Sequence, residues 1–206
     1  MDLSYELNLR KNGYTSIAGI DEAGRGPLAG PVVASAVMFD FDSVPEELSA
    51  VKDSKKISAK KREELFELIL GQAAGFGVGM CDHRAIDRLN ILEATFLAMK
   101  MALGNMRTKP SLILLDGNLP LPNYSSPQKS IVNGDNLVFS IAAASIIAKV
   151  TRDRIMAEMH KKYPAYQFLK HKGYGTKLHL DALKLYGPCE IHRRSFRPVK
   201  QLTRNY

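Results

Sequence analysis

The segment 19–31, with the sequence GIDEAGRGPLAGP, constrains this chain more than any other part of it. Two adjacent carboxylates, Asp21 and Glu22, follow a short apolar run, so they lose solvation and repel each other. A fold that keeps such a pair needs a compensating charge, and a divalent cation supplies one. The glycines on either side of Arg25 allow backbone N–H groups to approach an anion that the guanidinium also binds. The segment therefore predicts a metal site next to a phosphate site.

The net charge of +8 is concentrated in the last quarter of the chain. Residues 149–206 contain 14 Lys/Arg and 4 Asp/Glu, whereas residues 1–148 contain 15 and 17. A basic segment on a near-neutral body is typical of a protein that binds a polyanion such as nucleic acid. The alternative is a charged surface that only keeps the protein soluble, and charge alone does not decide between the two.

The length and the cysteine content indicate a cytoplasmic protein. A chain of 206 residues suits one domain with a small appendage, and no apolar run approaches the roughly 20 residues of a membrane span. The first residues lack the basic and apolar regions of an export signal. Cys81 and Cys189 lack metal-ligand spacing, which suits a reducing compartment and inert packing roles. We therefore expect no contact with a membrane.

Hydrophobic periodicity and turn residues predict an α/β fold, a mixed five-stranded sheet flanked by helices. Strands are expected over 15–21, 32–39, 76–81 and 112–115, with a short edge strand over 130–132. Helices are expected from an N-cap at Ser58 to about residue 70, over 86–106 with a break at Asn90, over 140–160, and from about 176 to 186 before an irregular basic tail. These elements suggest a main domain over 1–162 and a C-terminal helical extension over 163–206.

Four acidic residues stand where predicted strands or turns end. Asp21 and Glu22 end one strand, Asp116 ends another, and Asp135 lies in a turn just before the helix 140–160. If the two strands are parallel neighbours, their acids meet at one edge of the sheet, where ligand sites of α/β folds gather. Carboxylates without His or Cys favour Mg²⁺ or Mn²⁺, and a pair of such ions is typical of phosphoryl transfer. A single strand-end aspartate is more often a turn residue, so the joint pattern carries the prediction. Asp153, flanked by arginines, is expected in a structural ion pair.

Seven motifs in sequence resemble bacterial ribonuclease HII, of the type 2 ribonuclease H family. They are GIDEAGRG at 19–26, DSKK at 53–56, DG at 116–117, GD at 134–135, AAASIIAKVTRD at 142–153, HKGYGT at 171–176 and HRRSF at 192–196. They appear in family order over nearly the whole chain, which makes the resemblance very specific. It implies a ribonuclease H-like fold in which the C-terminal extension contributes to substrate binding.

The resemblance also implies roles for individual residues. Catalysis and metal ligation would fall to Asp21, Glu22, Asp116 and Asp135, with Asp21 bridging two ions. The backbone of Gly24, Arg25 and Gly26 would recognise the ribonucleotide 2′-hydroxyl and nearby phosphates. Tyr174 would pack at the RNA–DNA junction and sense the same hydroxyl, since only that group separates RNA from DNA at one nucleotide; the alternative is a turn residue between two glycines. Duplex-backbone contacts are expected from Lys55, Lys56, Lys149, Lys170, Lys172, Arg193 and Arg194, each of which is more often a plain surface charge.

The implied activity is that of a metal-dependent endonuclease using two Mn²⁺ or Mg²⁺ ions. It would hydrolyse the phosphodiester 5′ of ribonucleotides in duplex DNA or in RNA–DNA hybrids, leaving 3′-hydroxyl and 5′-phosphate ends. Ribonucleotide excision repair and removal of RNA from hybrids would be its cellular roles. We expect a monomer, and residues 199–206 contain no convincing clamp-binding peptide.

Two alternatives remain open at this stage. A ribonuclease HIII-like hybrid nuclease usually has lysine in place of Arg25 and an additional N-terminal domain, whereas only about 14 residues precede the first predicted strand here. A non-catalytic nucleic-acid-binding module would use the basic C-terminal region alone, but it gains nothing from four acids that repel phosphates.

Overall fold

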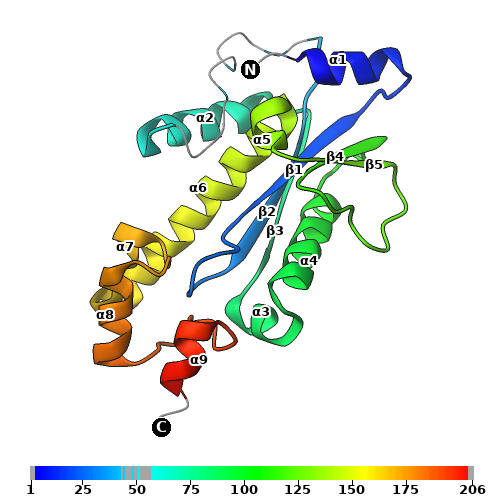
Figure 1. Ribbon diagram of the computed structural model, residues 1–206. Helices are drawn as coiled ribbons and strands as arrows, with labels where there is room; N and C mark the ends of the chain where they lie inside the picture. Colours follow the sequence, from blue (N-terminus) through cyan, green and yellow to red (C-terminus); the bar gives the residue numbers. More distant parts are fainter. Residues whose placement is uncertain (1–2, 43, 45–47, 49–50, 52–56, 204–206) are drawn as a thin grey trace.

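A mixed sheet with the strand order β3-β2-β1-β4-β5 forms the centre of the molecule (Figure 1). The strands are β1 (Ile17–Ala23), β2 (Val32–Met38), β3 (Gly75–Cys81), β4 (Leu112–Asp116) and β5 (Gln128–Ile131). The first three are antiparallel neighbours, whereas β4 and β5 run parallel to β1. The predicted five-stranded mixed sheet is confirmed, with strand bounds within about two residues of those expected.

The structure is a computed structural model that describes residues 3–42, 44, 48, 51 and 57–203. The duplex contacts expected of Lys55 and Lys56 fall outside these ranges. None of the helices in the described ranges combines the length and apolarity needed to cross a lipid bilayer.

The sheet is covered by helices on both faces, which explains why β2 is buried along its whole length. On one face lie α2 (Ala59–Gln72) and the long α6 (Phe139–Lys162), and on the other lie α3 (His83–Leu89) and α4 (Ile91–Gly104) (Figure 1). Side chains of β4 alternate between the two cores, as a strand with a period of two requires. The predicted break in the helix 86–106 is confirmed at Asn90, whose φ is 74°.

Helix α6 lies unusually close to β1 because both surfaces lack large side chains at the crossing. A Cβ atom built on Gly19 would lie 2.2 Å from the carbonyl carbon of Ser140. The alanines 142–144 follow on the same helix and are all buried. Gly19 of β1 and the small residues of α6 therefore form one close packing contact.

The start of α6 is capped from the other end of the chain. The residue before the helix, Val138, makes no side-chain cap. Instead Glu6, fully buried on α1 (Ser4–Lys11), accepts hydrogen bonds at Oε1 from the Ser140 backbone N–H (2.8 Å) and hydroxyl (3.0 Å). A carboxylate at a helix N-terminus also interacts favourably with the helix dipole. The first helix thus fixes the position of the longest one.

The segment after α6 packs against the loop between β1 and β2. It contains a 3₁₀ turn (Pro164–Tyr166), α7 (Phe168–His171), α8 (Lys177–Tyr186) and α9 (Arg197–Thr203), which gather at that end of the sheet (Figure 1). Its apolar side chains form a separate cluster with Leu28 and Ala29 of the loop. The expectation of an irregular tail was wrong at α9, whose Val199 is buried in this cluster.

Candidate active site

Three of the four predicted acids lie side by side at one edge of the sheet. Asp21 and Glu22 are inside β1, which continues to Ala23, and Asp116 is the last residue of β4. Because β1 and β4 are parallel and Ile20 is paired with Leu115, Asp21 and Asp116 are the next residues along on neighbouring strands. The parallel pairing thus brings together acids that are 95 positions apart in the sequence.

The carboxyl group of Asp21 is in an environment that opposes its ionisation. Burial, followed by repulsion from Glu22 and Asp116, raises the pKa of Asp21 well above its ordinary value. Hydrogen bonds from the Ser145 side chain and from the Glu22 backbone N–H (2.7 Å) act in the opposite direction but are smaller. A positive charge at this edge would relieve the repulsion, which fits the oxygen-only donor set for a hard divalent cation.

Asp135 is connected to this edge through its neighbour. It lies in a short helix, α5 (Gly134–Leu137), rather than in the predicted turn. The Gly134 N–H donates to Asp116 Oδ1 at 2.7 Å, so the start of α5 is held against the end of β4. Asp135 itself is buried and accepts a hydrogen bond from Asn136 Nδ2 at 2.8 Å. Within the part of the chain that the structure describes, no three His, Cys, Asp or Glu side chains are grouped closely enough to hold a metal ion.

A pocket of about 200 Å³ joins two of the four acids, Asp21 and Glu22, to the predicted substrate residues. Its walls are Asp21, Glu22, Ala23, Gly24, Arg25, Gly26, Ser145, Lys149 and Tyr174. Gly26 faces the tyrosine ring, since a Cβ atom built on it would lie 3.6 Å from Tyr174 Cε1. Arg25 is half-exposed and reaches Glu22 Oε1 at 3.3 Å. A larger depression of about 410 Å³ along the outer edge of β3 has no carboxylate among its lining residues, so we place the chemistry at the smaller pocket.

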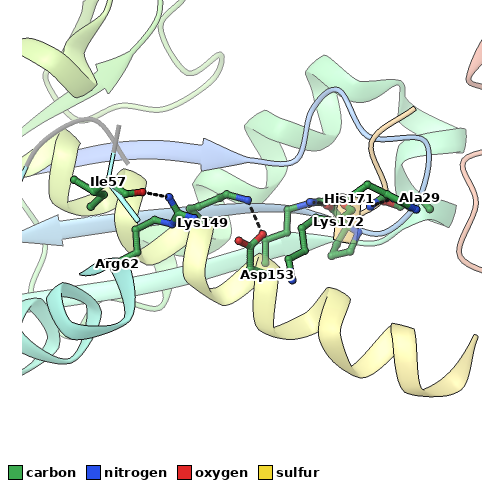
Figure 2. A network of polar contacts seen from close by, with 10 residues as sticks. Ala29, Ile57, Arg62, Lys149, Asp153, His171 and Lys172 are labelled. Carbon is green, nitrogen blue, oxygen red and sulfur yellow. Dashed lines mark hydrogen bonds and ion pairs between the residues drawn. The ribbon is translucent and has the colours of Figure 1, made fainter. Parts of the chain in front are cut away.

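One wall of the pocket comes from polar residues spaced four apart on α6. Lys149 donates to Asp153 Oδ1 at 2.6 Å (Figure 2), and burial lowers the pKa of Lys149. The ion pair expected for Asp153 therefore exists, but its partner is Lys149 and not a flanking arginine. The sequence analysis gave Ser145 no role, although its spacing of four from Lys149 on the mainly apolar first half of α6 is the signal that could have found it.

Arg193 does not have the role expected from the sequence. It was assigned to the duplex backbone, yet it is fully buried and its guanidinium donates to backbone carbonyls of the loop between β1 and β2. A basic residue in the last quarter of the chain is therefore not always a surface charge.

The histidines of the C-terminal segment cluster with one another, away from the acids. The rings of His171 and His179 stack with centroids 4.5 Å apart, and His179 Nε2 lies 2.9 Å from His192 Nε2. The other ring nitrogen of His179 lies 2.9 Å from the Tyr174 carbonyl oxygen. Burial lowers the pKa of His179 to about 4 and that of His192 to about 3. The cluster therefore holds the backbone of Tyr174 while its members are neutral.

These lowered pKa values predict acid lability. The unfolded chain binds protons at histidine near pH 6.5, whereas folded His179 and His192 do so only near pH 4 and 3. Between these limits the unfolded state binds more protons, so the free energy of unfolding falls as the pH drops from about 6.5 to 4.5. We expect the thermal unfolding midpoint of His192→Asn to depend less on pH in this window than that of the wild type. His160→Asn, outside the cluster on α6, is the control, and an equal slope for His192→Asn and the wild type would contradict the prediction.

Comparison with known proteins was made for the sequence and for the fold. The family described as Ribonuclease HII matches residues 18–199. A ribonuclease HII of Caldicellulosiruptor bescii is 52% identical over 93% of this chain and 91% of its own length. Among solved structures, the ribonuclease H2 from Pyrococcus horikoshii OT3 has a TM-score of 0.79 at 28% identity, covering 92% of this chain and 98% of that one. The PCNA:RNase HII complex from Archaeoglobus fulgidus matches with a TM-score of 0.72 at 28% identity, over 86% and 93% of the two chains.

Proposed function

The chain belongs to the ribonuclease HII family, and we propose that this ribonuclease H hydrolyses the phosphodiester 5′ of a ribonucleotide embedded in duplex DNA or in an RNA–DNA hybrid. The products would carry 3′-hydroxyl and 5′-phosphate ends. The observation that supports this best is the composition of one pocket. Two of the acids suited to metal-assisted phosphoryl transfer, Asp21 and Glu22, line a pocket of about 200 Å³ together with residues 24–26 and Tyr174. A scissile phosphate and the ribose next to it would thus be bound in the same space.

The acids are proposed to hold the metal ions on which the family depends. Asp21 would bind both ions, and Glu22, Asp116 and Asp135 would complete their surroundings. Two bound Mg²⁺ or Mn²⁺ ions would supply an activated water and stabilise the leaving 3′-oxygen. The donor set fits, because it contains only carboxylate oxygens and because like charges around Asp21 favour a nearby cation. The four carboxylates would have to turn toward the ions, since in the described structure no three of them are close enough together to bind one ion.

Selection of a ribonucleotide is proposed to depend on one hydroxyl group. DNA and RNA differ at a single nucleotide by the 2′-hydroxyl, which can both donate and accept a hydrogen bond. Gly24, Arg25 and Gly26 offer backbone groups on one side of the pocket, and the Tyr174 ring forms the other side. Specificity would then come from this hydroxyl and from duplex shape, with no reading of base sequence.

Residues 163–206 are proposed to act as a substrate-binding extension of a catalytic domain that ends at residue 162. Helix α6 ends at Lys162, and the segment beyond it carries Tyr174 to the pocket. Its excess of Lys and Arg would favour a polyanionic duplex. Ribonucleotide excision repair and removal of RNA from hybrids are the cellular roles that such an activity would serve, with the protein acting as a monomer.

The test compares three duplexes of one sequence: all DNA, DNA with a single ribonucleotide, and an RNA–DNA hybrid. With Mg²⁺ or Mn²⁺, we expect cleavage of the second and third and none of the first, with the cut 5′ of the ribonucleotide and a 5′-phosphate on the downstream product. Cleavage of the hybrid alone would favour the HIII-like alternative. Binding without cleavage of any duplex would favour a non-catalytic module.

A further inference from the structure

Two arginines are buried beneath the loop between β1 and β2. Arg152 of α6 is 1% exposed and Arg193, after α8, is 0% exposed. Among the described residues neither has a carboxylate within ion-pair distance, although a buried charge is normally paired. Burial lowers the pKa of Arg152 to about 10 and that of Arg193 to about 9, so both remain protonated at neutral pH. The fold thus keeps two buried cations next to the substrate pocket.

Each guanidinium donates to three backbone carbonyls, and five of these six carbonyls belong to this loop. Arg193 donates from Nη2 to the Gly24 oxygen (2.6 Å), from Nη1 to the Arg25 oxygen (2.9 Å) and from Nε to the Gly30 oxygen (3.0 Å). Arg152 donates to the carbonyl oxygens of Pro31 (2.9 Å), Ala29 (3.1 Å) and Lys172 (3.0 Å). The two side chains together bind both ends of the segment 24–31.

The contact with two consecutive carbonyls fixes the direction of two consecutive N–H groups. In a planar trans peptide the C=O of one residue and the N–H of the next point in opposite directions. Because Arg193 holds the carbonyls of Gly24 and Arg25, the N–H groups of Arg25 and Gly26 point away from it. Those two residues line the pocket, and in the described part of the chain neither N–H donates to a backbone carbonyl. Successive free N–H groups of this kind form a concave site for an anion or a hydroxyl oxygen.

We propose that Arg193 is a positioning residue for ribonucleotide recognition, which aims the N–H groups of Arg25 and Gly26 at the substrate. This inference rests on the proposed function of the same pocket. Arg152 supports the loop from the other side and lies beneath Tyr174, with its guanidinium carbon 5.9 Å from the ring centroid. It also leaves no room at Gly24, where a Cβ atom would lie 2.1 Å from Arg152 Nε. Arg193 of the C-terminal segment and Arg152 of α6 therefore set the shape of the substrate loop together.

The test uses Arg193→Lys and Arg193→Met, which separate the charge from the forked geometry. Lysine keeps the charge but cannot offer three N–H groups in a fixed plane, whereas methionine keeps only the bulk. With a duplex that contains one ribonucleotide, we expect KM to rise about tenfold or more in both variants and kcat to fall much less, because binding of the ground state is lost. In an Asp21→Asn background, which leaves the substrate intact, we expect the affinity ratio between this duplex and an all-DNA duplex to fall by a similar factor.

Ser111→Ala is the control for a loss of stability alone. It removes the hydrogen bonds between the Ser111 hydroxyl and the backbone of Ser16, at the opposite ends of β1 and β4 from the acids. We expect its KM and its ratio of affinities to match the wild type even where its unfolding midpoint is lowered.

Four outcomes are informative. If both Arg193 variants fold and keep the wild-type ratio of affinities for the two duplexes, the positioning role is overturned while the proposed function still stands. A wild-type ratio in Arg193→Lys alone would show that charge is sufficient, which also contradicts the proposal. If either variant unfolds, the NMR chemical shifts of the Arg25 and Gly26 amides in Arg152→Lys replace it, and unchanged shifts there would count against the loop being held from below. Failure of the wild type to prefer the ribonucleotide duplex would overturn the proposed function itself.

Discussion

Replacing Asp21 with asparagine lowers the rate of cleavage of a ribonucleotide-containing duplex by about a thousandfold or more, while the protein stays folded. Asparagine keeps the size of the side chain but removes the charge that would hold both metal ions, so kcat is expected to carry the loss. The free energy of unfolding should stay the same or rise. The raised pKa of Asp21 means that its ionised form is disfavoured in the folded state at neutral pH, and asparagine removes that cost.

This pair of readouts separates a catalytic role from a structural one. Asp42→Asn serves as the matched control, because Asp42 is an exposed carboxylate whose partner is Arg10. It should retain full activity. Full cleavage by Asp21→Asn, or an activity loss explained by unfolding, would contradict the assignment of Asp21 to the metal site.

The second large effect concerns the contact between α6 and β1. In Gly19→Ala the new methyl group would lie 2.2 Å from the Ser140 carbonyl carbon and 2.3 Å from the Ile141 nitrogen, both of them backbone atoms. Relief requires the helix to move away from the sheet, so we expect the free energy of unfolding to fall by about 3 kcal/mol or more. Activity should fall as well, because Ser145 and Lys149 of α6 line the pocket with Asp21.

Chemical denaturation measures the change in the free energy of unfolding for Gly19→Ala. Gly71→Ala is the control, for which we expect a gain in stability. Gly71 is in α2 and has no atom within 4 Å of an added Cβ. Alanine there should stabilise the protein by roughly 0.5–1 kcal/mol, because glycine is a poor helix former. A loss below about 1 kcal/mol for Gly19→Ala would show that the helix yields easily.

Local signals were sufficient for most of the fold. Ser58 was expected to cap a helix, and its hydroxyl oxygen accepts a hydrogen bond from the Lys61 N–H in α2. Asn90 was expected to divide two helices and does so. The capping of α6 by Glu6 could not be predicted, because it joins residues 134 positions apart. Helix α9 was missed for a related reason, since Val199 is buried by residues of other elements.

In the candidate site, too, local sequence signals predicted some features, whereas contacts between distant residues were missed. The apolar run that ends at Asp116 was sufficient to predict a buried strand. The meeting of Asp116 with Asp21 was expected on the condition that this strand lies parallel beside β1, which the structure shows. The approach of Tyr174 to Gly26 follows from contacts between the C-terminal segment and the loop, which no local pattern encodes. Burial of Arg193 was hidden for the same reason, because composition cannot distinguish a cation that binds carbonyls from one that faces solvent.

The parallel pairing of β1 with β4 also sets an order of events during synthesis. The antiparallel partner β2 follows β1 within a few residues, but Ser111, next to β4, is 95 positions after Ser16. A ribosome adding about 5–20 residues per second needs roughly 5–20 s to make that stretch. Throughout this interval one side of β1 has no strand to pair with, and Asp21 has no Asp116 beside it. The nascent chain therefore acquires its acidic edge only in the second half of translation, after the β1–β2 hairpin has been made.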